Sequence, residues 1–120
     1  MLLTKEFTFA AAHHLVDYQG KCARPHGHTY RLQVTVAGPM DSSNMVMDFS
    51  KLSGLVKEHV VDELDHHDLN ERIDGNTTAE NISRWIWQKL EPLLAVESVT
   101  LHKIKLWESP TSFVEYFGPE

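Results

Sequence analysis

The chain of 120 residues contains a single cysteine, Cys22, so no disulfide can form within it. A small scaffold held together by disulfides is therefore excluded, and the thiol of Cys22 serves either packing or chemistry. No apolar run is long enough for a signal peptide or a membrane-spanning helix. These absences predict a cytoplasmic protein that does not enter a membrane.

Positive charge is also scarce. The 11 lysines and arginines are outnumbered by 17 aspartates and glutamates, which gives a formal net charge of −6 at pH 7. A chain without a cationic surplus is poorly suited to replace the counterions of a phosphate backbone, so we expect no nucleic-acid partner. Lys21, Arg24 and Arg31 form at most a local positive spot for a small phosphorylated ligand.

The hydrophobic pattern predicts one domain over residues 1–120. Apolar residues alternate in four segments and recur at helical spacing in two segments between them. In chain order, the predicted elements are strands at 3–13 and 29–37, helices at 49–64 and 77–93, and strands at 99–107 and 112–116. This order predicts an α+β fold, ββααββ, with a four-stranded antiparallel sheet and two helices on one face.

Both predicted helices have recognisable starts. Asp48 or Ser50 is a suitable N-cap for the first helix, because a short polar side chain can accept a hydrogen bond from the first turn. Thr77 and Glu80 have the spacing of a capping box, which predicts that the second helix opens at Thr77.

Strand alternation also sorts the histidines at the ends of the first two strands. His26 and His28 are two residues apart, so an extended backbone that reaches back to His26 points both toward the face of Tyr30. In the first strand, the same alternation puts His13 on the apolar face and His14 on the other, unless a bulge reverses them. We therefore expect three imidazoles to converge.

Three neutral imidazoles predict a zinc ion with one tetrahedral position left open, as in a catalytic site. Cys22 lies four residues before His26, where it can close the site as a fourth ligand or act beside it as a thiolate. The spacing leaves both possibilities open. Ordinary hydrogen-bonded core histidines are the alternative, and the convergence from two strands favours the metal.

Two further carboxylates are candidates for chemistry. Asp65 with His66 or His67 is a candidate acid/base dyad, although a polar helix end would have the same composition. Glu108 ends an apolar row of the third strand, where its oxygens can accept two hydrogen bonds from a flat ligand edge.

Five motifs resemble the 6-pyruvoyltetrahydropterin synthase family, and they span nearly the whole chain. They are AAAHHL at 10–15, CARPHGH at 22–28, LDHHDLN at 64–70, TTAEN at 77–81 and WESPTS at 107–112. The three-residue gap between Cys22 and His26, the chain length and the ESPTS ending are similar to the bacterial 6-carboxytetrahydropterin synthase branch, which serves queuosine biosynthesis.

The resemblance implies a T-fold in which the sheets of several subunits join edge to edge into barrels. Active sites then form between subunits of a homo-oligomer, commonly a hexamer built as a dimer of trimers. The implied reaction converts 7,8-dihydroneopterin triphosphate to 6-carboxytetrahydropterin and releases acetaldehyde and triphosphate. Zinc is the implied cofactor, and no redox cofactor is consumed.

The resemblance also implies roles for single residues. By position, it assigns zinc to His13, His26 and His28, proton transfer to Cys22 and to Asp65 with His66, and pterin binding to Glu108 and Thr78.

Three alternatives remain at this point. The first is a pyruvoyl-tetrahydropterin synthase, which eliminates triphosphate without cleaving a carbon–carbon bond. The second is a non-catalytic, zinc-stabilised binding module in which Cys22 closes the metal site. The third, a zinc hydrolase, is disfavoured because the chain has no HExxH helix.

Overall fold

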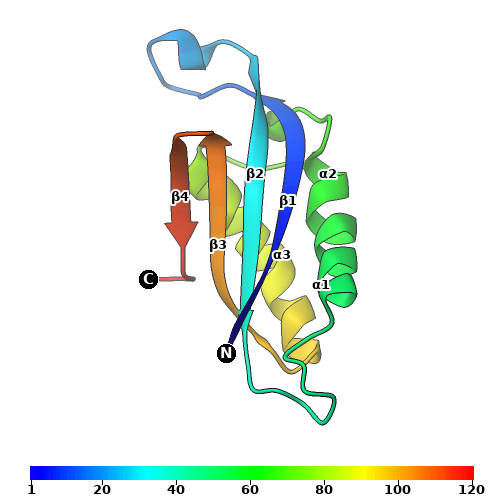
Figure 1. The fold of residues 1–120 in the computed structure, drawn as a ribbon. Helices are drawn as coiled ribbons and strands as arrows, with labels where there is room; N and C mark the ends of the chain where they lie inside the picture. Colours follow the sequence, from blue (N-terminus) through cyan, green and yellow to red (C-terminus); the bar gives the residue numbers. More distant parts are fainter.

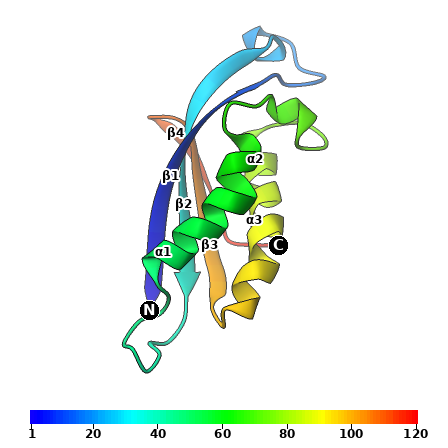
Figure 2. The same ribbon diagram turned by 90° about the vertical axis from the view of Figure 1, so that its right-hand side faces the viewer.

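The computed structural model describes residues 1–120 and contains one four-stranded antiparallel sheet with the order β1-β2-β3-β4. The strands are β1 (Leu2–His13), β2 (His26–Ala37), β3 (Thr100–Ser109) and β4 (Ser112–Tyr116). All helices lie on one face of the sheet, as the side view shows (Figures 1 and 2). The predicted α+β architecture is therefore confirmed.

The pairing of β1 with β2 fixes which residues face the helices. All 12 residues of β1 pair with β2, from Leu2 opposite Ala37 to His13 opposite His26. The strand geometry thus reaches back to His26, as the alternation argument required. The inward row of β2 is completely buried and consists of Tyr30, Leu32, Val34 and Val36.

The first helical region contains a wide turn in its middle. It runs as α1 (Phe49–Val56), a π-helical turn η2 (Lys57–Val61) and α2 (Asp62–Leu64), and the Asp48 side chain caps its start. Its fully buried residues lie four apart, at Leu52, Val56, Val60 and Leu64. Four α-helical residues turn about 40° beyond a full circle, so this stripe would drift away from the sheet. The π turn has more residues per turn, which compensates for this rotation and keeps Leu64 on the buried side.

Helix α3 (Ala79–Val96) covers the rest of the sheet. Its N-cap is Thr78, whose side chain accepts a hydrogen bond from the Asn81 N–H at 3.2 Å. The prediction that Thr77 caps this helix is wrong, because Thr77 is fully buried and its hydroxyl faces the end of β1 instead. No helix of the chain combines the length and apolar character that crossing a membrane requires.

Two loops surround the end of the sheet where β1 finishes. Residues 14–25 join β1 to β2, contain the short 3-10 turn η1 (Lys21–Ala23) and project beyond the sheet (Figure 1). Residues 65–78 join α2 to α3 and contain a second 3-10 turn, η3 (Leu69–Glu71). This second loop packs on the outer edge of β1, where Asp68 forms a bridge with Ala12.

The carboxyl-terminal tail crosses α3 at Trp87. Gly118 has a φ of +106°, and a Cβ at this position would lie 2.8 Å from Cζ2 of the indole. Glycine is therefore required for two reasons, since a side chain would strain the backbone and collide with a buried ring.

We predict opposite effects for the same substitution at two glycines. Gly118→Ala should lower the free energy of unfolding by about 1–2 kcal/mol, because of the left-handed backbone and the contact with Trp87. Gly54→Ala should raise it by about 0.5–1 kcal/mol, because an added Cβ in the middle of α1 meets no atom within 4 Å. Urea unfolding measures both values, and a stable Gly118→Ala variant would contradict the packing of the tail.

Candidate metal centre and active site

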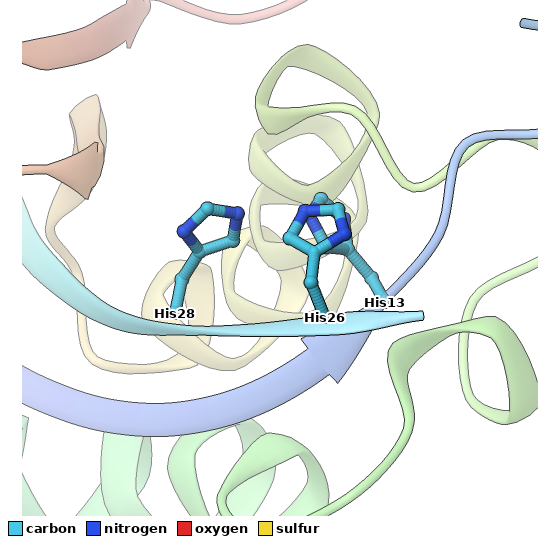
Figure 3. Close-up of side chains that lie close together, drawn as sticks. All are labelled: His13, His26 and His28. Atoms are coloured by element: carbon cyan, nitrogen blue, oxygen red, sulfur yellow. The ribbon is translucent and has the colours of Figure 1, made fainter. Parts of the chain in front are cut away.

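Three histidines meet at the end of β1 and the start of β2 (Figure 3). His13 and His26 are opposite one another in the register of the two strands, and His28 lies two residues further along β2. Their ring centroids are 4.6 to 5.0 Å apart. One nitrogen from each ring lies within 4.8 Å of the other two. The structure thus places three potential ligand atoms around one point.

Hydrogen bonds orient two of these rings. Nδ1 of His13 lies 2.8 Å from the Thr77 carbonyl, and Nδ1 of His26 lies 2.7 Å from the Arg24 carbonyl. A carbonyl only accepts, so each Nδ1 carries the proton and each Nε2 keeps its lone pair. This is the usual way in which a protein prepares a histidine to bind a metal.

Two buried nitrogens of the group have no hydrogen-bond partner in the protein. They are Nε2 of His13 and Nε2 of His28. A buried polar atom without a hydrogen bond is costly, and a metal ion would satisfy both atoms at once. The three residues therefore fit a metal ion on the evidence of their own geometry.

Burial favours the neutral form of His28. It lowers the pKa of this imidazole, while the nearby Glu108 carboxylate acts in the opposite direction. Oε1 of Glu108 lies 3.6 Å from Nε2 of His28. A neutral imidazole is the form that binds metals, so the environment of His28 suits a ligand.

Cys22 is not part of this group. Its half-buried side chain is in η1, and its carbonyl accepts a hydrogen bond from the Leu15 N–H at 2.8 Å. The clustered ligand atoms come from histidines alone, and Cys22 does not contribute a fourth. Of the two roles that the sequence left open for Cys22, the role as a fourth ligand is not seen in this arrangement.

Asp65 and His66 form a hydrogen-bonded pair at the outer edge of β1. Oδ2 of Asp65 lies 3.0 Å from Nδ1 of His66, and Oδ1 accepts a hydrogen bond from the Ala10 N–H at 2.9 Å. The Ala10 N–H, and secondly His66, hold the pKa of the Asp65 carboxyl below its usual range. The His66 ring is 83% exposed. No hydrogen bond or ion pair joins this dyad to the three histidines or to Cys22.

Glu108 and Thr78 line one cavity of about 270 Å³, together with Leu15 and Phe113. The cavity lies between the start of α3 and the hairpin of β3 and β4. The two residues that the family resemblance assigned to pterin binding therefore line the same cavity. This space adjoins the histidines through Glu108.

Arg31 is one of the three basic residues that could form a local positive spot. Arg31 pairs with Glu6 at 3.0 Å, and its guanidinium lies 4.1 Å from the centre of the Trp107 ring on the face without helices. Arg31 is therefore paired with neighbours in the sheet. Lys21 lies in η1, and Arg24 directly follows it.

Three polar residues near the histidines were missed by the sequence argument. Asn70 and Thr77 donate hydrogen bonds to the His14 carbonyl. Tyr30 was placed in an apolar row, but its buried hydroxyl has no hydrogen-bond partner, and burial raises its pKa. Its ring stacks on Phe9 with centroids 5.0 Å apart. Alternation reveals which face a residue occupies, but not whether its polar atom finds a partner there.

Comparison with known proteins decides the family. The family model for 6-pyruvoyl tetrahydropterin synthase matches residues 2–119. The chain belongs to this family. It is 38% identical to the 6-carboxy-5,6,7,8-tetrahydropterin synthase of Haemophilus influenzae, over 95% of this chain and 96% of that protein. It is 39% identical to the Synechocystis protein of the same name, over 98% and 94% respectively.

Relatives with another name are somewhat less similar. The 6-pyruvoyl tetrahydrobiopterin synthase of Dictyostelium discoideum is 32% identical over 98% of this chain and 96% of that protein. The structure of Caenorhabditis elegans 6-pyruvoyl tetrahydropterin synthase superposes with a TM-score of 0.88 at 27% identity, covering 99% of this chain and 96% of that one. The predicted T-fold and the prediction of an enzyme similar to the 6-carboxytetrahydropterin synthases are confirmed.

We predict that adjacent histidines differ in their effect on metal binding. His13→Ala should weaken zinc binding more than 100-fold, because losing a ligand costs more than the roughly 10- to 100-fold typical of an outer partner. His14→Ala should bind zinc as the unmodified protein does, since His14 is outside the group. Competition with a chromogenic chelator measures both affinities. Equal losses in the two variants would contradict the assignment of His13.

Proposed function

We propose that this enzyme converts 7,8-dihydroneopterin triphosphate to 6-carboxytetrahydropterin with release of acetaldehyde and triphosphate, as a cytoplasmic step of queuosine biosynthesis. The main support is the open group of three histidines with two unpartnered nitrogens. The choice of this reaction is supported by the 38–39% identity to proteins named 6-carboxytetrahydropterin synthases, against 32% for one named a pyruvoyl synthase.

Zinc is the proposed metal, held by His13, His26 and His28 (Figure 3). When bound, it would supply a Lewis acid that polarises substrate oxygens at neutral pH. The ligand set favours zinc, because it consists of imidazoles alone and leaves a position free. Thr77 and Arg24, through their carbonyls, keep two of the rings in the required tautomer.

Proton transfer is assigned to Cys22 and to the dyad of Asp65 and His66. The lowered pKa of Asp65 keeps this carboxylate charged, so it accepts the Nδ1–H of His66 and orients the ring. Nε2 of His66 is then free to give or take a proton at the substrate.

The separation of the dyad from the three histidines supports a site shared between subunits. Within one chain, Asp65 and His66 are bonded at the outer edge of β1, while the histidines lie on the helix-covered face. We therefore infer a homo-oligomer, a hexamer built as a dimer of trimers, in which the dyad of one subunit serves the metal of another. The sheet has two edge strands, β1 and β4, and the loop after α2 bonds to β1 only from Ala10 onward.

Pterin binding is assigned to Glu108 and Thr78, which share a cavity beside the metal centre. The carboxylate can accept two hydrogen bonds from the amino-pyrimidine edge of a pterin. Because Glu108 lies 3.6 Å from His28, a pterin bound to Glu108 would lie next to the metal ligands.

A pyruvoyl-tetrahydropterin synthase is the second candidate, because relatives with that activity in their names also align over almost the whole chain. The non-catalytic zinc module has less support, because it needs Cys22 as a ligand and the thiol lies outside the group.

Product analysis distinguishes the two reactions. The purified zinc-loaded protein, given 7,8-dihydroneopterin triphosphate, should release acetaldehyde and triphosphate in equal amounts and yield a 6-carboxy product by mass spectrometry. The His13→Ala variant is the matched control for contaminating activity. A pyruvoyl product without acetaldehyde would move the enzyme to the second candidate.

The role of Cys22 can be tested separately from folding. Cys22→Ala should keep stoichiometric zinc and the thermal stability of the unmodified protein, because the thiol is not among the clustered ligands. Its turnover should fall by about 10²- to 10⁴-fold, the usual contribution of a positioned acid or base. Loss of zinc together with unfolding would instead support the structural module.

A further inference from the structure

The loop after α2 runs along the outer edge of β1 like a short additional strand. The Ala10 carbonyl accepts from the His66 N–H at 2.6 Å, and the Ala12 N–H donates to the His67 carbonyl at 3.1 Å. These contacts involve every second residue of β1, as the pairing of an edge strand requires. The next residue in this series is His14, one position beyond the end of β1.

At His14, the hydrogen bonds to the outer edge come from a side chain instead of from the backbone of the loop. Oδ1 of Asn70 accepts from the His14 N–H, and Nδ2 of Asn70 donates to the His14 carbonyl, both at 3.0 Å. A carboxamide has the same donor and acceptor groups as a peptide, so Asn70 offers what a neighbouring strand would offer. Asn70 is itself held in η3, where its N–H donates to the Asp68 side chain at 3.0 Å.

Thr77, just before α3, contacts His13, His14 and Asn70. Its hydroxyl lies 3.3 Å from the His14 carbonyl, from Oδ1 of Asn70 and from Nδ1 of His13. Its carbonyl accepts from the His13 ring at 2.8 Å. Thr77 is completely buried, so these polar groups have no water to replace a lost partner.

We propose that Asn70 and Thr77 form a clamp that holds His13 in position as a metal ligand. This inference rests on the proposed metal centre. His13 and His14 are adjacent imidazoles at a strand end, so the residue types alone do not select the inward one. A strand residue whose N–H and carbonyl point to the outer edge fixes the facing of its neighbour. By bonding both groups of His14, Asn70 keeps the His13 ring on the helix-covered face.

Both residues are positioning residues, because they contact the backbone and a ligand ring rather than the substrate. A purely structural role would affect the unfolding temperature alone. A clamp on a ligand must also change how the metal is held. The decisive measurements are therefore zinc affinity and the visible absorption spectrum of the cobalt(II)-substituted protein, which reports ligand geometry.

Asn70→Ala should weaken zinc binding about 10- to 100-fold, the range found for outer partners of metal ligands, and change the cobalt spectrum. Asn70→Asp keeps an acceptor for the His14 N–H but loses the donor, so its zinc affinity should be intermediate. Thr77→Val should weaken zinc binding several-fold.

Matched controls exist for both substitutions. Asn76→Ala removes a carboxamide that accepts from the Val16 N–H at 3.1 Å, two residues beyond His14. Thr4→Val removes a hydroxyl at the opposite end of β1, which bonds Thr35. Both variants should bind zinc and give the cobalt spectrum of the unmodified protein.

The clamp is overturned if the folded Asn70→Ala and Thr77→Val variants match the unmodified protein in zinc affinity and cobalt spectrum. Equal weakening by Asn76→Ala would also overturn it, because the effect would then be general. If Asn70→Ala does not fold, Asn70→Asp and Thr77→Val decide by the same two measurements. If the unmodified protein itself binds no zinc, the proposed metal centre fails together with the clamp that depends on it.

Discussion

The uninterrupted pairing of β1 with β2 is the constraint on which the rest of the structure depends. One register places Tyr30 and its buried row against the helices and also brings His13 opposite His26. Because side chains alternate along a strand, a shift of the β1–β2 register by one residue would expose the apolar row. The same shift would separate the three histidines. The free energy that holds the core in register therefore also contributes to holding the three histidines together.

The four-residue repeat of the first helical region determines where the dyad lies. Leu52, Val56, Val60 and Leu64 remain buried only because the π turn widens the helix, and the chain then leaves α2 directly at the edge of β1. There the Ala10 N–H stabilises the charged form of Asp65. The position of the dyad is thus determined by the hydrogen bonds between this loop and the outer edge of β1.

Particular residues show where sequence reasoning reached its limit. Alternation chose His13 over His14 and placed His28 beside it, since period and burial depend on local spacing. The capping-box spacing chose Thr77 instead of Thr78 as the helix cap, because both side chains have the chemistry and only the contact of Thr77 with His14 separates them. Arg31 pairs with Glu6, a residue 25 positions earlier that the pairing of β1 with β2 brings within 3.0 Å.

The sequence by itself determined the α+β class, the apolar faces, the trio of histidines and the family, because each follows from the order and spacing of residue types. The tertiary structure alone decided that Cys22 lies outside the ligand group, that Asp65 and His66 stay at the sheet edge, and that Asn70 bonds His14. These facts depend on contacts between segments far apart in the chain. Local periodicity determines which way a side chain faces, but only the folded backbone determines what lies opposite it.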